Sequence, residues 1–206
     1  MRLAGCILVL GSMLATRSGA QPPMELVTKL QQGGYVLVMR HAHSPSAPPQ
    51  KADVDPTNLT GERQLDEVGK SQAREFGRAA TELHIRFAQV LTSPAFRARE
   101  TVRLAGITNP SVVPALAMSE QQTMMTTAPT ASGEQLRVLA SKSPSIGSNL
   151  LIVTHLPNIL AAFPKDSDAF ADGDVLVLRP LGGTLAVIGR IKAGEWDLGA
   201  NRSARK

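Results

Sequence analysis

Five consecutive apolar residues, Tyr35–Met39, are preceded by two glycines and followed at once by Arg40 and His41. A short apolar run bounded in this way is typical of a strand buried on both faces of a sheet. In an α/β sheet, the carboxyl end of such a strand opens into the crevice where ligands bind. A guanidinium and an imidazole are therefore predicted to face a bound anion there. Taken alone, the pair also fits a solvated strand end.

A second segment repeats the arrangement of a strand followed by basic side chains. The apolar run Ala88–Leu91 precedes Ser93 and Pro94, which suit the N-cap and the first position of a helix. Arg97 then falls in the first turn of that helix, near the positive end of the helix dipole. This segment predicts a second strand end that carries a phosphate-binding side chain.

A third segment places a histidine after a buried strand. The apolar run in Asn149–Thr154 is followed by His155, and Pro157 is positioned to open another helix. Three strand ends are thus expected to bring two guanidiniums and two imidazoles to one edge of the sheet. These four residues are Arg40, His41, Arg97 and His155.

These motifs resemble the histidine phosphatase (phosphoglycerate mutase-like) superfamily, in particular its small bacterial exported branch. The matching segments are Arg40-His41-Ala42, the Ser-Pro-x-x-Arg-Ala-x-x-Thr run Ser93–Thr101, and Val153-Thr154-His155. Glu62–Leu65 and Gly69–Ala73 resemble the family's lead into its first long helix, so the likeness covers nearly all of the chain after residue 25. Ala42 replaces the family's usual glycine, an alternative seen in small bacterial branches.

The resemblance implies an α/β fold with three layers, in which a mostly parallel sheet carries helices on both faces. The residue pattern itself adds a C-terminal hairpin at the sheet edge, formed by Val175–Leu178 and Leu185–Ile191 around Pro180 and Gly182-Gly183. Apolar periodicity predicts three further helices. They are Met24–Gln32 with Leu26, Val27 and Leu30 on one face, Asp66–Leu83, and Ser132–Ala140 with Ser132 as its cap and Leu136 and Leu139 buried.

The resemblance also implies a chemistry that needs neither a metal nor another cofactor. His41 would attack phosphorus in line and become phosphohistidine, which water would then hydrolyse. Arg40, Arg97 and His155 would bind the phosphoryl oxygens. Because phosphoryl transfer proceeds through a loose transition state, catalysis would depend on positioning and on stabilising the oxygen charges.

The proton donor for the leaving oxygen is less clearly indicated. Glu120 lies where some family members carry an acidic donor, although a solvent-facing loop carboxylate is an equal alternative. Glu62, Asp53 and Asp55 are weaker candidates. Leu156 directly follows His155, which argues against the family branches that have an aspartate at that position.

The pair His41-x-His43 raises the alternative of a metal site. A catalytic zinc typically has about three protein ligands, and the other histidines are His155 and His84, the latter at the end of a predicted helix. We therefore predict no metal site and expect His43 to be a loop residue beside the phosphate. A polar loop at 42–60, which leaves directly from His41, and a segment at 109–129 that is expected to be irregular should determine specificity.

Residues 1–20 have the pattern of a signal peptide. Arg2 precedes the apolar stretch Leu3–Ala15, and Ser18-Gly19-Ala20 forms a small-residue cleavage site. The pattern predicts a periplasmic or secreted protein whose single domain spans residues 21–206. The apolar stretch is too short for a stable membrane anchor, and cleavage would remove Cys6, the only cysteine.

The formal net charge of +5 does not indicate a nucleic-acid partner. Loss of Arg2 and Arg17 with the signal gives 5 − 2 = +3, and the rest belongs to Arg202, Arg205 and Lys206 in the terminal tail. The body of the chain is close to neutral, with one Trp and one Tyr.

The leading hypothesis is a phosphoric monoester hydrolase that acts on a small phosphorylated substrate outside the cytoplasm, such as a phosphorylated sugar or an envelope glycan component. Two alternatives stay open: a phosphate-binding protein without turnover, and a metal-dependent hydrolase that uses His41 and His43. The sequence carries no indication of the oligomeric state.

Overall fold

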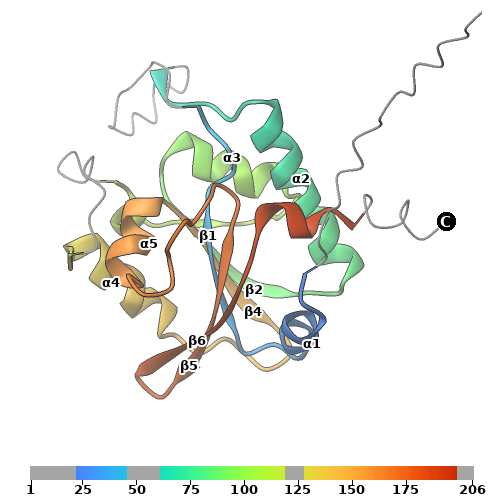
Figure 1. Ribbon diagram of the computed structural model, residues 1–206, viewed down its shortest axis with the longest axis vertical. Coiled ribbons are helices and arrows are strands. Elements are labelled where there is room, and N and C mark those ends of the chain that lie inside the picture. The colour runs from blue at the N-terminus through green and yellow to red at the C-terminus, as the bar shows by residue number, and fades with distance from the viewer. Residues whose placement is uncertain (1–21, 46–60, 119–127, 199–206) are drawn as a thin grey trace, which may run out of the picture.

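A six-stranded sheet with the order β3-β2-β4-β1-β5-β6 forms the centre of the structure (Figure 1). This computed structural model describes residues 22–45, 61–118 and 128–198. The pairs β3-β2, β2-β4 and β4-β1 are parallel, whereas β1-β5 and β5-β6 are antiparallel. The strands are β1 (Val36–Arg40), β2 (Phe87–Thr92), β3 (Ser111–Val112), β4 (Asn149–Thr154), β5 (Val175–Leu181) and β6 (Thr184–Ile191). The mixed α/β sheet and the edge hairpin β5-β6 confirm the predicted fold class.

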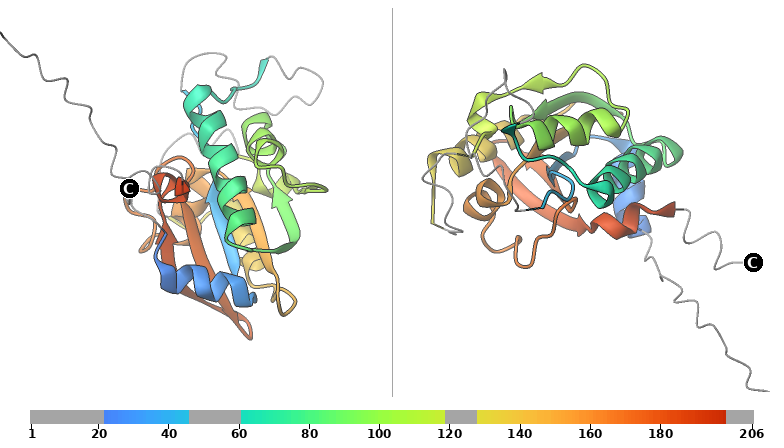
Figure 2. Two further views of the ribbon diagram at one scale, coloured as in Figure 1. Left: turned by 90° about the vertical axis from the view of Figure 1, so that its right-hand side faces the viewer. Right: turned by 90° about the horizontal axis from the view of Figure 1, so that it is seen from above.

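Helices pack on both faces of the sheet, as Figures 1 and 2 show. Helices α1, α2 and α3 contribute to one hydrophobic core and α4 and α5 to the other, so the domain has three layers. The helices are α1 (Met24–Gln32), α2 (Glu67–Glu82), α3 (Phe96–Leu104), α4 (Ala131–Ala140) and α5 (Leu156–Ala162), with short 3₁₀ helices η2 (Pro114–Leu116) and η4 (Ala193–Trp196).

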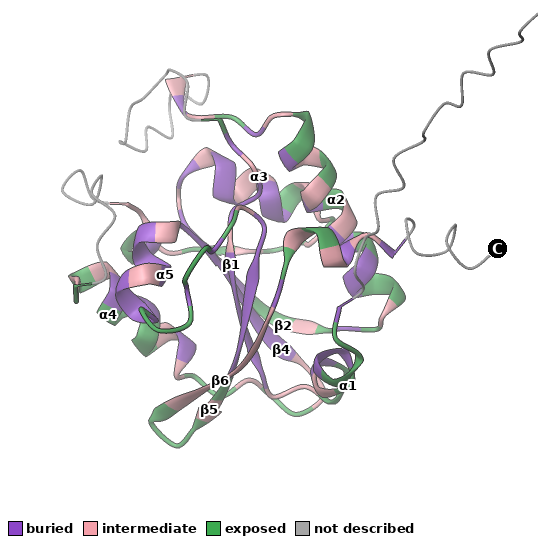
Figure 3. Ribbon diagram, viewed as in Figure 1, coloured by how far each residue is buried: buried purple, intermediate pink, exposed green. Residues whose placement is uncertain are grey.

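Alternation along the central strands explains why one sheet supports two cores. In β1, Leu37 and Met39 belong to the core under α1, α2 and α3, whereas Val36 and Val38 belong to the core under α4 and α5. Successive strand side chains point to opposite faces. Because both faces are covered, these strands are apolar between their ends, and β4 is buried along its whole length, as is β1 except for Arg40 (Figure 3).

Two of the predicted helices were located closely. Helix α1 has the predicted bounds and buries Leu26, Val27 and Leu30. The predicted span Asp66–Leu83 corresponds to α2 with its two caps, since the Asp66 side chain accepts a hydrogen bond from the Gly69 N–H and Leu83 is the C-cap.

The predicted start of α3 was wrong. Ala95, not Ser93, is the N-cap, and the helix begins at Phe96 rather than at Pro94. The Ser93 hydroxyl accepts from the Ala95 N–H and lies 2.7 Å from His155 Nε2. Ser93 therefore contacts His155 at the end of β4 instead of capping α3, and a turn separates it from the helix.

Smaller corrections concern α4 and the segment before it. Thr130, not Ser132, caps α4, because its hydroxyl accepts from the Gly133 N–H. Leu136 is buried as predicted, but Leu139 is only partly buried. The segment expected to be irregular contains β3 and η2, since β3 extends the sheet by pairing with β2.

Several predictions fall outside the described residues. These are the signal peptide, most of the loop at 42–60, Glu120 and the basic tail. Within the ranges that the structure describes, no helix is both long and apolar enough to cross a lipid bilayer.

Candidate active site

The register of the parallel strands places the predicted site residues at one edge of the sheet. Arg40 ends β1 opposite Thr154 of β4, so His41 and His155 leave neighbouring strands at the same level. Thr92 of β2 pairs with Val153, which brings Ser93 beside them. The carboxyl ends of parallel strands are where α/β folds bind ligands.

Arg97 from the first turn of α3 joins the two histidines. Its Nε donates to His41 Nε2 at 3.1 Å, and its Nη2 lies 3.1 Å from His155 Nδ1. The two imidazole rings are 5.2 Å apart and meet edge to face. All three side chains are buried. Arg97 Nη2 also donates to the Met118 sulfur at 3.3 Å.

The hydrogen-bond partners assign the tautomer of each histidine. His41 Nδ1 is 2.8 Å from the Ala42 carbonyl oxygen, an acceptor, so Nδ1 carries the proton and the lone pair of Nε2 accepts from Arg97. His155 is the other tautomer, with the proton on Nε2, because its Nδ1 accepts from Arg97 and its Nε2 donates to the Ser93 hydroxyl. The unprotonated nitrogen of His41 therefore faces the centre of the site.

Burial and the nearby guanidiniums keep both imidazoles neutral. Desolvation, followed by the positive charge of Arg97, lowers the pKa of His41 and that of His155 well below 6.5. Burial, with Arg63 close by, lowers the pKa of Arg97 to about 10, so this guanidinium stays charged at neutral pH. The site thus combines two neutral imidazoles with fixed positive charge.

Arg40 is held by the segment that leads into β5. Its Nη1 donates to the Phe170 carbonyl oxygen at 2.8 Å, and its Nε lies 2.8 Å from Asp172 Oδ1 without the alignment of a hydrogen bond. Burial raises the pKa of Asp172, although the Arg40 charge opposes this shift. The Gly173 N–H donates to the carbonyl oxygens of Arg40 and His41 at 3.2 and 3.1 Å, which fixes this segment to the end of β1.

Two residues of the segment before α2, Glu62 and Arg63, add further charged groups near the site. Arg63 donates to the Ser44 carbonyl oxygen, and its charge contributes to lowering the pKa of both His41 and His155. The buried carboxylate of Glu62 accepts from the Phe96 N–H at 2.5 Å with Oε2. Glu62 therefore caps α3, which has no side-chain cap of its own.

His43 has different partners from His41. Its Nδ1 lies 2.9 Å from Asp66 Oδ2, and its backbone N–H donates to the Gln72 side chain at 2.8 Å. No cluster of three or more His, Cys, Asp or Glu side chains that could hold a metal occurs in residues 22–45, 61–118 and 128–198. In this arrangement His41 and His43 do not form a pair of ligands.

The structure brings together Arg40, His41, Arg97 and His155, as the sequence predicted, whereas Glu120 lies outside the described residues. Sequence reasoning missed Asp172 and Arg63. Asp172 precedes β5, which runs antiparallel to β1, so the start of β5 meets the end of β1. That pairing was the signal needed to place an Asp-Gly step at the site. The only sequence signal for Arg63 was its position in the segment before α2 that resembles the family.

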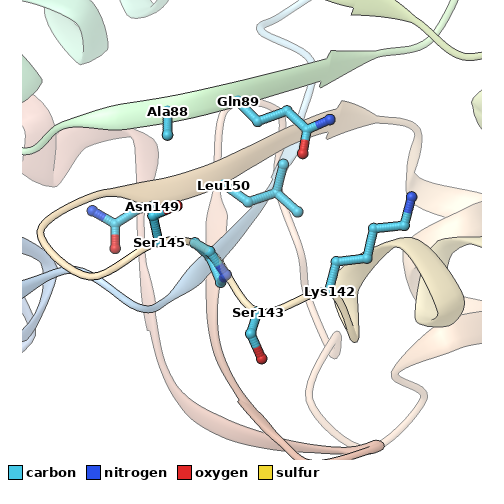
Figure 4. A pocket seen from close by; sticks show the side chains of 8 residues that line it. Ala88, Gln89, Lys142, Ser143, Ser145, Asn149 and Leu150 are labelled. Carbon is cyan, nitrogen blue, oxygen red and sulfur yellow. The ribbon is translucent and has the colours of Figure 1, made fainter.

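A separate pocket of about 400 Å³ lies at the other end of β4 (Figure 4). It contains none of the motif residues, and one of its lining residues, Lys142, is charged. The residues that line it are Ala88, Gln89, Lys142, Ser143, Pro144, Ser145, Asn149 and Leu150.

Comparison with known structures shows the same fold. The protein histidine phosphatase SixA in complex with tungstate has 17% sequence identity and a TM-score of 0.55, with 77% of this chain and 97% of that chain covered. A candidate phosphohistidine phosphatase SixA from Agrobacterium tumefaciens has 19% sequence identity and a TM-score of 0.54, with 77% of this chain and 97% of that chain covered. The open reading frame Rv3214 from Mycobacterium tuberculosis has 18% sequence identity and a TM-score of 0.55, with 78% of this chain and 98% of that chain covered. No curated protein sequence matches the chain.

A sequence family adds evidence that these distant structures do not provide by themselves. The histidine phosphatase superfamily (branch 1) matches residues 36–123, a range that includes the Arg40-His41 motif and the Ser93–Thr101 motif. His155 lies beyond that range, but the structure places it against Arg97. This match, the shared fold and the convergence of the motif residues support the histidine phosphatase superfamily and a phosphatase function.

Proposed function

We propose that this protein is a metal-independent phosphatase that hydrolyses a small phosphate monoester through a phosphohistidine intermediate on His41. The observation that carries the proposal is the position of Arg97, which donates to His41 Nε2 and to His155 Nδ1 at 3.1 Å each. The guanidinium therefore lies between the two imidazoles, and its two N–H groups mark where a phosphoryl group would bind. A phosphoryl group that binds there would meet both donors and, once Arg97 turns to its oxygens, the nucleophilic lone pair of His41 Nε2.

Binding of the substrate would redirect the donors of Arg97. In the free site they are occupied by imidazole nitrogens, and a phosphate dianion is a stronger acceptor than either. Arg97 would turn to the phosphoryl oxygens, together with Arg40 and Arg63, and leave His41 Nε2 open to the phosphorus. Three guanidiniums around one phosphoryl group supply the charge stabilisation that a loose transition state requires.

Ser93 allows His155 to change its role as the substrate binds. A hydroxyl donates and accepts, so Ser93 serves either tautomer of the imidazole, and it already accepts from the Ala95 N–H. With an anion in place of the Arg97 donor, the proton of His155 is favoured on Nδ1, where it faces a phosphoryl oxygen. Ser93 then donates to Nε2. His155 thereby becomes a donor without acquiring a net charge.

The proposal extends to substrate and location. The residues before 21 have the pattern of an export signal, which supports a periplasmic or secreted enzyme that acts on a small phosphorylated molecule. SixA was solved with tungstate, a tetrahedral oxyanion like phosphate, which supports oxyanion binding by the same fold. Glu120 is our candidate for the proton donor. Glu120→Ala should slow esters of poor leaving groups more than p-nitrophenyl phosphate, and equal slowing of both would contradict that role.

The main test is hydrolysis of p-nitrophenyl phosphate by the purified mature protein in excess EDTA. We expect turnover under chelation, and His41→Ala should lower it by at least about 10³-fold, because the covalent route is lost. His84→Asn is the matched control, since His84 has φ 56°, a conformation that Asn tolerates. An acid-labile phosphoenzyme should form on the wild type and not on His41→Ala.

Two outcomes would contradict the proposal. Activity that disappears with EDTA and returns with a divalent cation would favour the metal-dependent hydrolase. Saturable phosphate binding without turnover of any monoester in a broad panel would favour a binding protein.

A further inference from the structure

We propose that Asp172 is a positioning residue whose carboxylate stabilises the positive charge that the His41 ring acquires when Nε2 is phosphorylated. This inference rests on the proposed function. It assigns a residue that neither the sequence motifs nor the match to residues 36–123 includes. It also gives the segment before β5 a part in the reaction.

The geometry places Asp172 behind the nucleophile. Its Oδ1 lies 3.9 Å from His41 Nδ1, the ring nitrogen on the side opposite to Nε2. The leaving oxygen in an in-line displacement is on the far side of the phosphorus from Nε2, so Asp172 does not reach it as a proton donor. A carboxylate behind the ring instead acts on the charge of the ring, as an orienting carboxylate does in a catalytic triad.

The Asp172 carboxylate differs from its acidic neighbours, because its contacts are with Arg40 and His41 of the site. The side chain is only 16% exposed, and its buried Oδ1 has no aligned hydrogen bond. Glu62 accepts from the Phe96 N–H, Asp66 from the Gly69 N–H, and Asp174 pairs with Arg190. These three carboxylates stabilise local structure, whereas Asp172 faces Arg40 and His41.

The charge balance of the reaction creates the need for such a group. When the His41 Nε2–P bond forms and the P–O ester bond breaks, the leaving oxygen departs with the bonding pair and takes a proton from a donor or from water. The ring keeps its proton on Nδ1 and so becomes a phosphoimidazolium cation. Attack of water on the phosphorus then breaks the Nε2–P bond, returns the electron pair to Nε2 and restores the neutral ring.

The surroundings of His41 oppose that cation. Arg97 of α3 donates to the ring, and Arg40 of β1 and Arg63 before α2 act on it through their charge. Each of these three charges lowers the pKa of His41. His155, from the end of β4, is neutral and buried. Asp172 supplies negative charge within 4 Å of the ring. Coulombic energy at this separation is substantial in a partly dry site.

The segment around Asp172 is rigidly attached to the same two residues. The Phe170 carbonyl oxygen accepts from Arg40 Nη1 at 2.8 Å. The Gly173 N–H bridges the carbonyl oxygens of Arg40 and His41. Gly173 has φ 81°, and an added Cβ would come within 2.9 Å of the Ala193 Cβ. The position next to Asp172 is therefore constrained, which holds the carboxylate in place before the substrate arrives.

The test compares Asp172→Asn with Asp168→Asn, which removes the same charge from an exposed position in the same loop. In rapid-mixing experiments with p-nitrophenyl phosphate, Asp172→Asn should form the phosphoenzyme roughly 10²-fold more slowly, the order seen when one preorganised electrostatic group is lost. The inhibition constant of inorganic phosphate should stay the same or decrease, since an anion near the bound anion is removed. Asp168→Asn should match the wild type in both measurements.

A second variant guards against misfolding. Asp172→Glu keeps the charge and should remain within about tenfold of the wild-type rate of phosphorylation. Wild-type rates in a folded Asp172→Asn protein would overturn the role of Asp172 and leave the proposed function intact. A phosphate inhibition constant that rises as much as the rate falls would show that Asp172 only holds Arg40, which also overturns it. If the wild type shows no turnover, the proposed function fails and this role fails with it.

Discussion

The two ends of β4 each bury a polar side chain completely, but they use it in opposite ways. Asn149 at the start of the strand and His155 just after its end are both 0% exposed. The Asn149 amide accepts from the Tyr35 N–H at 3.2 Å and donates to the carbonyl oxygens of Leu30 and Arg86 at 2.8 and 3.1 Å. All of these partners are neutral backbone groups. Asn149 therefore joins α1, β1 and the start of β2.

His155 instead has side-chain partners that other molecules could replace. Arg97 and Ser93 contact its two nitrogens, and the surrounding buried atoms include polar ones without an aligned partner, namely Arg40 Nε, Glu62 Oε1 and Asp172 Oδ1. Buried polar groups are normally paired, and an exception calls for an explanation. Burial of a polar residue therefore does not distinguish structure from function, whereas incompletely paired charge at the end of the strand does.

The largest difference is expected when Arg97 is replaced. Arg97→Gln removes the guanidinium that lies between the two imidazoles, so kcat/KM should fall by about 10²–10³-fold. The free energy of unfolding should stay the same or increase, because burial of this charge is unfavourable, as its lowered pKa shows. Steady-state kinetics and urea denaturation measure the two quantities.

Arg103→Gln is the control for this prediction. Arg103 lies on the same helix with an exposed side chain and a salt bridge to Glu100. Its replacement should leave both the free energy of unfolding and kcat/KM close to the wild-type values, because exposed ion pairs contribute little. If Arg97→Gln lost stability but kept its activity, the two ends of β4 would not differ as described.

The opposite result is expected at the start of β4. Asn149→Ala removes the side-chain partner of the Tyr35 N–H and of the Leu30 carbonyl oxygen, whereas the Arg86 carbonyl oxygen keeps the backbone N–H of residue 149. The free energy of unfolding should therefore decrease by about 2–3 kcal/mol. The activity of the folded fraction should not change, since Asn149 is at the other end of the strand. Gln135→Ala, on the exposed face of α4, should change stability by less than about 0.5 kcal/mol. A fall in kcat at full folding would contradict this assignment.

The fold was predictable where local pattern and tertiary contact agree. The apolar runs before Arg40 and before His155 identified β1 and β4, because strands buried on both faces leave no ambiguity in the pattern. Helix α1 was located to the residue, since its glycine stop and its apolar stripe coincide. The start of α3 was not, because the group that caps its first turn is Glu62, which is 34 residues away in the chain.

The site was predictable only in the part that lies at the ends of parallel strands. Arg40, His41 and His155 follow apolar runs, so their place at one edge is a consequence of the sheet. Asp172 precedes a strand, and its arrival at the same edge depends on the antiparallel pairing of β5 with β1. Nothing local in the sequence fixes that pairing. The role of Asn149 was missed for the same reason, since its three partners come from three separate segments.

The smallest expected effect is the dependence of stability on pH, which should come from the His155 end alone. Burial lowers the pKa of His41 and His155 below 6.5, so below that pH the unfolded chain binds more protons than the folded protein. Stability therefore rises with pH through this range and is lost as the pH falls below about 6.5, by at most about 1.4 kcal/mol per pH unit for each histidine. The Asn149 end carries no titrating group and should not contribute. Urea denaturation between pH 7.5 and 5.5 should show this slope in the wild type and in Asn149→Ala alike, whereas His155→Gln should reduce it by up to half. An unchanged slope in His155→Gln would mean that His155 is protonated in the folded protein. It would contradict the conclusion that both imidazoles beside Arg97 are neutral.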